Sequence, residues 1–535
     1  MGSPRDRSQS NGLKVSLASA RMRCAGNRGA FSLQTRNALH SSPLVPLFVL
    51  CLAAYLFSAG GHFYVADHMI MYSTTKAIAE RGSLNIAFEL GQFAKMIPGM
   101  FPWFSEDKPA YYSFYGVLQP LLAVPLYLAG KWIGVEPWRV VTTVFGPVVS
   151  AATVCAVYAV SRRLGDKPVT STVLALLYGF STIVWPYVKF FFDSITATFM
   201  IVASLYFLFD QTSSRRSLVY SGIFATLAFL GRIMSALILP AMILYVALKP
   251  QARLRAKMTN LASFLTPIVI GALFFAYLNI ARFGSPLYYG GGAGDPFNSQ
   301  LYSMNPLIGA YGMLLSSGEG LFLYSPICAL GFFALFDSRH ERKWERFVLC
   351  EFFLATLLFY ARMPWWHGWG SPWGARYLVL TLPCLIVAMG PFFESTAKTI
   401  VGRIGLVIAA AIGVFLNFVG VLIDSGYSQA YLFDIGAFDP GKYPEPGIWI
   451  PRFSPLEAGL RLLYSETYPA VFYQYANELM FLKSRFDLYL YYAFGPAALI
   501  VFSAVMVAAA LWLVKTLRRG EANVASTLGC SDSAP

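Results

Sequence analysis

Two aspartates lie where an apolar run meets a more polar segment, and a carboxylate in that position can take part in catalysis. Asp67 follows the apolar run Leu44–Ala59, and Asp193 follows the segment Trp185–Phe192. Such a carboxylate can act as a general base toward an acceptor hydroxyl or amine. Asp also favours helix starts, so either residue could instead cap a helix. The local sequence leaves both interpretations open.

Cations occur in the same segments, most of them at the end of an apolar span. A lipid phosphate would explain them, because charge-assisted hydrogen bonds hold phosphate oxygens and stabilise a departing phosphate. The alternative for each one is a side chain that reaches to the lipid headgroups. The candidate phosphate ligands are Lys108, Lys189, Arg282 and Arg376.

Aromatic residues accompany these charges in two segments. Lys108–Gly116 is rich in tyrosine, and Pro364–Tyr377 holds four tryptophans. Aromatic faces suit stacking on sugar rings, although tryptophan is also the usual anchor at a membrane interface. The candidate sugar or acceptor contacts are Tyr111, Tyr115, Trp366, His367 and Trp369.

Metal and nucleotide sites are not indicated. His62, Asp67 and His68 are close in sequence, but no Cys/His spacing typical of zinc occurs. The run Tyr289–Asp295 is rich in glycine but lacks the Gly-Lys-Ser/Thr ending of a phosphate-binding loop. We therefore expect no metal ligands and no cofactor, although a divalent cation is compatible with the sequence.

Composition places these residues in a membrane protein. Of 535 residues, 56% are hydrophobic and 13% are charged, with a mean hydropathy of +0.55. One water-soluble globule would have too few polar residues to coat that apolar surface. The net charge of +14 comes from clusters between apolar runs, and no nucleic-acid-binding motif accompanies them. We therefore exclude a nucleic-acid partner.

The basic clusters predict the topology, because Lys and Arg in short loops stay cytoplasmic. Keeping all clusters on one side requires that Tyr111–Gly134 enters the membrane interface without crossing. It also requires that Ser217–Leu248 is a hairpin split at Gly231–Arg232, since one helix would be about 48 Å long against a core of about 30 Å. The clusters begin at Arg5, Arg162, Arg215, Lys249, Arg339, Lys398 and Lys515.

The predicted fold is all-α and polytopic, with about 12 transmembrane helices and juxtamembrane helices in the first external loop. Both termini are expected in the cytoplasm. The expected parts are a cytoplasmic basic tail (1–42), a transmembrane catalytic module (43–393) with its first external loop at 61–137, a transmembrane helix (394–423), an external loop (424–487), and a last transmembrane helix with a cytoplasmic tail (488–535).

In order and context these segments resemble the C-type (GT-C) membrane glycosyltransferases. That superfamily includes protein O-mannosyltransferases, the lipid A aminoarabinose transferase and rhizobial lipopolysaccharide galacturonosyltransferases. Asp67 is similar to the family's first-loop Asp, and Asp193 to the acid of its second external loop. Lys108 with Tyr111–Pro125 is similar to its juxtamembrane Lys/Tyr/Pro helix. Asp67 is followed by His68 instead of a second acid, which leaves metal dependence open.

The resemblance implies transfer of a sugar from a polyprenyl-phosphate-linked donor to a lipid, glycan or protein acceptor. Asp67 would be the base, Asp193 an orienting acid, and the four cations phosphate ligands. The protein would act on the extracytoplasmic face of a bacterial inner membrane, in contact with membrane lipids. The alternatives from the residues are a lipid or polysaccharide transporter or flippase, and a non-catalytic scaffold. A transporter is expected to carry ionisable groups midway through the membrane.

Overall fold

The computed structural model describes residues 42–529 except 98–100, 102, 106, 213, 250–253, 289, 291–297, 338–341, 369–372, 438–444 and 465–484. The chain divides into two units, one formed by residues 47–509 and the other by residues 1–46 with 510–535. The first unit holds every candidate site residue discussed below. In the described part of the second unit, residues 44–46 begin α2 and residues 510–529 complete α24.

Regular structure in the described residues is helical, with two isolated β-bridges at Asn85–Tyr112 and Ile423–Phe486. A helix satisfies its own backbone hydrogen bonds, which the interior of a bilayer requires. The all-α prediction is therefore confirmed for these residues. The helices are α2 (Leu44–Phe57), α3 (Ala66–Arg81), α4 (Ala87–Met96), α5 (Leu118–Ile133), α6 (Pro137–Arg163), α7 (Pro168–Phe180), α8 (Val184–Tyr187), α9 (Asp193–Leu208), α10 (Arg215–Gly231), η1 (Ile233–Ile238), α11 (Leu239–Leu248), α12 (Leu254–Phe283), η2 (Ser299–Tyr302), α13 (Pro306–Leu315), α14 (Leu321–Tyr324), α15 (Pro326–Leu335), α16 (Lys343–Ala361), η3 (Arg376–Thr381), α17 (Leu382–Ala388), α18 (Gly390–Thr396), α19 (Ile400–Leu422), α20 (Ser425–Asp434), α21 (Glu445–Trp449), η4 (Pro451–Phe453), α22 (Pro455–Tyr464), α23 (Tyr489–Phe494) and α24 (Pro496–Gly529).

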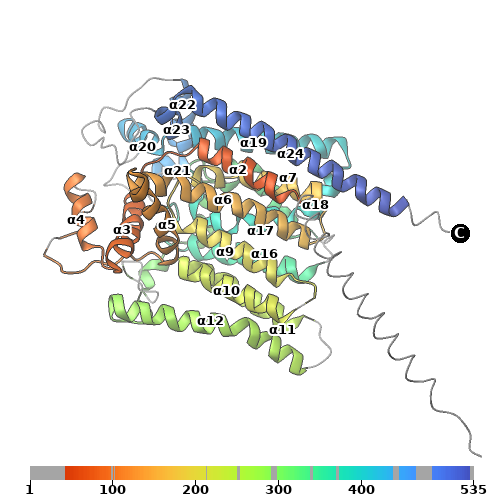
Figure 1. Ribbon diagram of the computed structural model, residues 1–535, viewed down its shortest axis with the longest axis horizontal. Coiled ribbons are helices and arrows are strands. Elements are labelled where there is room, and N and C mark those ends of the chain that lie inside the picture. Colours follow the sequence, from red (N-terminus) through yellow and green to blue (C-terminus); the bar gives the residue numbers. More distant parts are fainter. Residues whose placement is uncertain are drawn as a thin grey trace, which may run out of the picture. The chain divides into compact units, whose positions relative to one another are not determined.

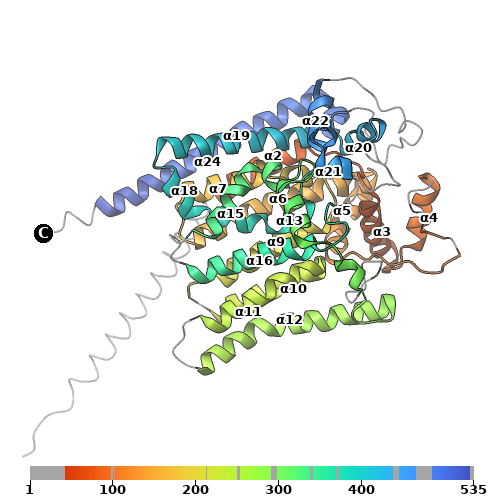
Figure 2. The same cartoon turned by 180° about the vertical axis from the view of Figure 1, so that it is seen from behind.

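Four described helices are long and apolar enough to cross a membrane by themselves: α6, α12, α19 and α24. The bent pair of η3–α17 and α18 would make a fifth span if it crosses as one. Several shorter apolar helices run beside them, and Figures 1 and 2 show α6, α9, α10 and α12 side by side. The chain is thus a multi-pass membrane protein.

Polar contacts define the two ends of these helices. At the first end, which we call the Asp67 end, Arg232 is bonded to Asp193 at the start of α9. At the second end, which we call the Arg163 end, Arg163 at the end of α6 is paired with Asp210 after α9. The Lys249 ammonium, after α11, donates to the Asp210 carbonyl there. The chain from α10 to α11 therefore runs to the Asp67 end and back, which confirms the predicted hairpin at Arg232.

Helix α5 does not pass between the two ends. Gln119 in its first turn accepts a hydrogen bond of 2.8 Å from Thr196 in the first turn of α9. Lys131 in its last turn is paired with Glu80 of α3, which lies across the ends of the long helices in Figure 1. Both ends of α5 are thus held by elements of the Asp67 end. This agrees with the prediction that the segment Tyr111–Gly134 enters the interface without crossing.

Candidate active site

Asp67 is the second residue of α3 and is partly buried. The residue at the cap position is Val65, and its side chain makes no capping hydrogen bond. Asp67 is therefore not the helix cap that the sequence left open. Its carboxylate instead is hydrogen-bonded to the side chain of Tyr115 and interacts with the charge of Arg376.

Asp193 is the first residue of α9 and is only 3% exposed. Phe192 holds the cap position, so Asp193 is not a cap either. Its carboxylate accepts a hydrogen bond of 2.5 Å from Arg232 and interacts with the charge of Asp67. The two acids predicted to share one face of the membrane are therefore close enough for their charges to interact, Asp67 from α3 and Asp193 from α9.

Arg232 reaches Asp193 because the helix breaks at this residue. Its backbone is extended (φ −147°, ψ 113°) between α10 and η1, and its N–H bonds back to the Ala228 carbonyl. The second amino group of its guanidinium donates to the Tyr360 hydroxyl at 3.0 Å. An arginine can hold two partners in this way because its donors form a rigid planar fork.

Arg376, the first residue of η3, is the cation that interacts with Asp67. Its guanidinium lies over the ring of Phe192, 5.3 Å from the centroid, and over the ring of Tyr377, 5.0 Å away. Tyr377 in turn stacks on Tyr360, with centroids 4.2 Å apart. These contacts orient the cation beside Asp67, and aromatic faces stabilise it there by about 0.5–2 kcal/mol.

A cleft beside this group combines charged and apolar walls. Asp193, Arg232 and Arg282 supply the charges, and Tyr115 joins the cleft to Asp67. Arg282, in the last turn of α12, donates to the Ser113 carbonyl at 3.1 Å and to Asn279 Oδ1 at 3.0 Å. The apolar wall comes from α10, η1, α12 and the segment before η3, through Phe229, Ile233, Met234, Phe275, Met363 and Trp365.

The other predicted site residues differ in where they lie. Trp366 and His367 are buried next to each other, with ring centroids 5.7 Å apart, and His367 interacts with the charge of Arg376. Lys108 is exposed and lies over the ring of Tyr111, whose hydroxyl is bonded to Ser105 rather than to the cleft. Trp369 lies outside the described residues.

Two buried titratable groups flank Arg376. Burial, with the positive charge of Arg376, lowers the pKa of His367 to about 4. Burial raises the pKa of Glu319 well above its usual value, although Arg376 opposes the shift. Glu319 lies in the turn before α14, is 3% exposed, and its Oε2 has no hydrogen-bond partner among the described residues. His367 is therefore neutral at pH 7, and Glu319 favours its protonated form.

Lys189 has a buried partner instead of facing the cleft. Its ammonium is paired with Asp487 and also donates to the Val421 carbonyl. Asp487 in turn contacts His62, which also contacts Asp424. His68, which follows Asp67, packs its ring on Phe192 at 4.6 Å.

Sequence reasoning missed four of these residues: Arg232, Glu319, Asp424 and Asp487. The signal for Arg232 was present, because a single arginine interrupts the apolar run Ser217–Leu248 at the point where the span must turn. Asp424 and Asp487 begin and end the predicted external loop, but nothing in the sequence pairs them with His62. Glu319 shows no local signal apart from standing between two glycines.

Comparison with known proteins gives one family match. The model of the dolichyl-phosphate-mannose-protein mannosyltransferase family matches residues 130–276, from α5 to α12. This range includes Asp193 and Arg232. No curated protein matches the chain.

Solved structures show a weak likeness. ArnT from Cupriavidus metallidurans bound to undecaprenyl phosphate is 14% identical, with 78% of this chain and 73% of that chain covered and a TM-score of 0.46. The same protein in its apo state is 13% identical, with 89% of this chain and 77% of that chain covered and a TM-score of 0.45. The apo oligosaccharyltransferase of Archaeoglobus fulgidus is 14% identical, with coverage of 76% and 59% and a TM-score of 0.44. The chain spans less than two thirds of that protein, and at these TM-scores the likeness does not establish a common fold.

Of the site residues, Asp193 and Arg232 lie inside the stretch that the family model matches, whereas Asp67, Arg282 and Arg376 lie outside it. The sequence resemblance was drawn from short motifs over residues 43–393, and the family model matches a continuous stretch inside that range. This match confirms the resemblance of the chain to the C-type membrane glycosyltransferases.

Proposed function

We propose that the protein transfers a sugar from a polyprenyl-phosphate-linked donor to a lipid, glycan or protein acceptor. In this reaction the acceptor oxygen or nitrogen attacks the anomeric carbon, and its proton passes to the Asp67 carboxylate. The bond between the anomeric carbon and the phosphate oxygen breaks, and its electron pair leaves with the polyprenyl phosphate. Asp193 orients the reacting groups, and Arg232 fixes Asp193.

One observation carries this proposal. Two carboxylates from different helices, Asp67 and Asp193, interact beside a cleft whose walls are partly charged and partly apolar. A polyprenyl-phosphate-linked sugar is likewise partly charged and partly apolar, because an anionic phosphate joins the sugar to a long apolar chain. The cleft thus offers cations to the phosphate and an apolar wall to the first units of the chain.

The phosphate ligands proposed are Arg282 on the cleft and Arg376 beside Asp67. Fixed cations of this kind stabilise negative charge that develops on a leaving phosphate. Lys108 and Lys189 are further candidate phosphate ligands, but neither side chain lines the cleft. Lys108 is exposed beside Tyr111, and a phosphate would have to compete with Asp487 for Lys189.

The acceptor and sugar contacts proposed are Tyr115, Trp366 and His367, with Tyr111 and Trp369 farther along the same segments. Tyr115 lines the cleft and bonds Asp67, so it is placed to touch the reacting sugar. We also propose that about 12 helices or bent helix pairs cross the membrane, and that the Asp67 end faces away from the cytoplasm of a bacterial inner membrane. The positive-inside distribution supports this orientation, because Arg163, Lys249 and Arg342 gather at the opposite end.

A transporter is not favoured by the placement of these charges. Asp193 begins α9, and Arg232 stands at the break that follows α10, so their pair lies at helix ends. A transporter is expected to hold such groups near the middle of the membrane.

Binding of the carrier lipid tests the proposal without knowledge of the sugar. Thermal unfolding of the purified chain in detergent is measured with undecaprenyl phosphate and with undecaprenol. We expect the phosphate to stabilise the protein, by about 2.7 kcal/mol at a concentration of 100 times the Kd, and the alcohol to have little effect. Arg376→Gln should remove the difference, whereas Arg403→Gln, at an arginine that bonds the Ala397 carbonyl within the described part of the chain, should keep it. Equal stabilisation by both lipids would reject a phosphate site.

A further inference from the structure

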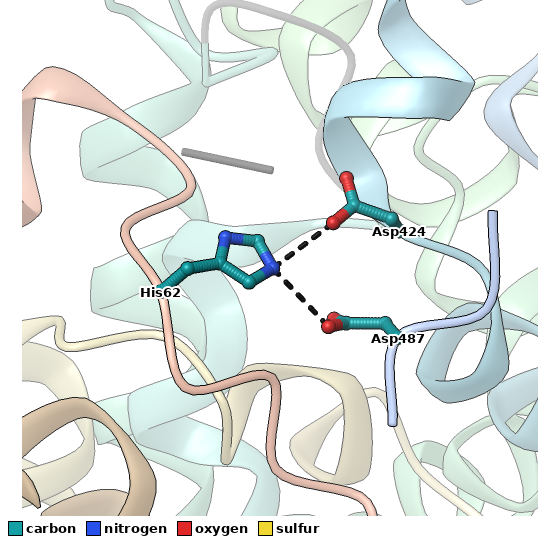
Figure 3. A group of neighbouring side chains, drawn as sticks. All are labelled: His62, Asp424 and Asp487. Atoms are coloured by element: carbon teal, nitrogen blue, oxygen red, sulfur yellow. Dashed lines mark hydrogen bonds and ion pairs between the residues drawn. The ribbon is translucent and has the colours of Figure 1, made fainter. Parts of the chain in front are cut away.

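His62, Asp424 and Asp487 form a buried cluster away from the cleft. His62 lies in the loop between α2 and α3, Asp424 directly precedes α20, and Asp487 lies just before α23. All three side chains are fully buried. Figure 3 shows the imidazole pointing its Nε2 between the two carboxylates, at 3.0 Å from Asp424 Oδ2 and 3.2 Å from Asp487 Oδ1.

The atoms that do not face the centre of the cluster are already occupied. His62 Nδ1 lies 3.1 Å from the Phe63 carbonyl, to which it can donate. Asp424 Oδ1 accepts the backbone N–H groups of Gly426 and Tyr427. Metal ligands in proteins are held in this manner, with the outward atom of each ligand bound by a carbonyl or a donor.

The outward oxygen of Asp487 is also occupied, in this case by two side chains. Its Oδ2 accepts a hydrogen bond of 2.5 Å from the Tyr64 hydroxyl and is paired with the Lys189 ammonium. Its Oδ1 is left to face His62. A side chain at Gly60 would collide with Asp487 Oδ1 and the Tyr64 hydroxyl, so this close approach requires glycine.

The facing atoms have the spacing of metal ligands. The three lie within 4.8 Å of one another. Ligand atoms around a tetrahedral zinc are about 3.3 Å apart, given bonds of roughly 2.0–2.2 Å, and the two distances to Nε2 are close to that value. One imidazole nitrogen and two carboxylate oxygens are also a ligand set that zinc accepts.

A protonated imidazole is the competing explanation. Burial lowers the pKa of His62, but the charges of Asp424 and Asp487 outweigh it and raise that pKa to about 10. One N–H, however, can point at only one oxygen. Nε2 makes a hydrogen bond with Asp487, whereas Asp424 Oδ2 lies 3.0 Å from Nε2 as an ion-pair contact and has no hydrogen bond among the described residues. A buried acceptor without a donor is destabilising, and a cation between the three atoms would remove that penalty.

We infer that His62, Asp424 and Asp487 bind a divalent transition-metal ion, with Zn²⁺ as the best match. The ion holds the segments before α20 and α23 against the loop that leads into α3. It thereby positions α3, which carries Asp67 five residues after His62. The inference does not depend on the proposed transfer reaction, and it departs from the expectation of no metal.

The metal content of the purified full chain tests this inference. The chain is prepared without chelator, and its metals are measured by inductively coupled plasma mass spectrometry. We expect about one equivalent of zinc, or of another transition metal, per chain. His62→Gln and Asp424→Asn should lower it at least tenfold, because each removes one of three ligands. Glu345→Gln is the control, since Glu345 is also a buried carboxylate but bonds Tyr245 outside the cluster.

A second measurement covers the case in which a variant does not fold. Wild-type protein is treated with a chelator, dialysed, and unfolded thermally before and after addition of Zn²⁺ alone. We expect the chelator to lower the Tm and Zn²⁺ to restore it. Protein that contains no stoichiometric metal and whose Tm responds to neither reagent would overturn the inference and leave the cluster as an imidazolium held by two carboxylates. Metal that persists unchanged in both ligand variants would overturn it as well.

Discussion

Arg232 donates a hydrogen bond of 2.5 Å to the Asp193 carboxylate, at the end of the helices where Asp67 also lies. This pair joins the break after α10 to the first turn of α9. The pair fixes the Asp193 carboxylate, whose charge interacts with that of Asp67. The helix break at Arg232 therefore holds the site together.

Removal of one partner from this pair should be costly. Arg232→Met leaves the Asp193 carboxylate buried without its cation, which costs about 3–5 kcal/mol in comparable buried pairs. The double variant Arg232→Met with Asp193→Leu should regain a large share of the lost stability. Thermal unfolding in detergent, analysed as a double-mutant cycle, measures the coupling.

The control for this cycle is an exposed ion pair. Arg461 and Glu457 are bonded at 2.8 Å on α22, with side chains 51% and 36% exposed. Arg461→Met should leave the Tm unchanged. An equal effect of the two arginine substitutions, or strict additivity in the cycle, would show that Arg232 and Asp193 are not coupled.

Close packing of Gly116 should be essential to the site. A Cβ at this residue would collide with the backbone carbonyls of Leu230 and Gly231, next to Arg232. Gly116→Ala should therefore displace either Tyr115 or the end of α10, and lower both the Tm and binding of undecaprenyl phosphate. Gly405→Ala on α19 meets nothing within 4 Å and should change neither. Identical behaviour of the two variants would contradict this packing.

Stability should fall in mild acid because of His367. Burial and Arg376 lower its pKa from 6.5 to about 4 in the folded protein. Below pH 6.5 the unfolded chain binds a proton that the folded protein does not, so stability declines from pH 6.5 to about 4 and levels off below that. The full contribution is about 3 kcal/mol.

The measurement is the Tm of wild type and of His367→Gln between pH 7.5 and 4. Other groups titrate in both proteins, so only the difference between the two curves reports His367. We expect wild type to lose more stability than the variant as the pH falls. Parallel curves would show that His367 is not held neutral.

The path of α5 can be tested with single cysteines. After removal of the seven native cysteines, Phe114→Cys and Trp132→Cys place a thiol at either end of α5, where the native side chains are 40% and 88% exposed. A membrane-impermeant maleimide should label both from the same side of the membrane. Lys167→Cys, at the Arg163 end, should be labelled only from the other side. Labelling of the two α5 positions from opposite sides would show that α5 crosses.

The positions of Asp67 and Asp193 were predictable, because apolar runs and basic clusters together determine which helix ends lie on the same side. The hairpin at Arg232 followed from the same argument, since a helix of 32 residues is too long for the membrane. Apolar runs and basic clusters do not show which distant segments contact each other. Asp193 and Arg232 are each visible in the sequence, but their contact depends on how α9 and α10 pack.

The contact between Lys189 and Asp487 is a second example of a pairing that the sequence patterns do not reveal. A cation at the outer end of an apolar span predicts contact with an anion, and a lipid phosphate was the candidate. In the structure the anion is Asp487, which lies 298 residues along the chain. Hydropathy and charge counts carry no information on such a contact, and the same holds for His62 with Asp424.

Sugar transfer by variants of Asp67 tests the account most directly. Membranes containing wild-type protein or Asp67→Asn are given a radiolabelled pool of polyprenyl-phosphate-linked sugars, and label in the acceptor fraction is counted. Asp107→Asn is the control, because this aspartate is exposed and, among the described residues, is bonded to nearby Ser105. Loss of a general base lowers rates by about 10²–10⁴-fold, so Asp67→Asn should transfer almost nothing while its membrane content equals that of wild type. Turnover by Asp67→Asn equal to that of Asp107→Asn would contradict the assignment of Asp67 as the base.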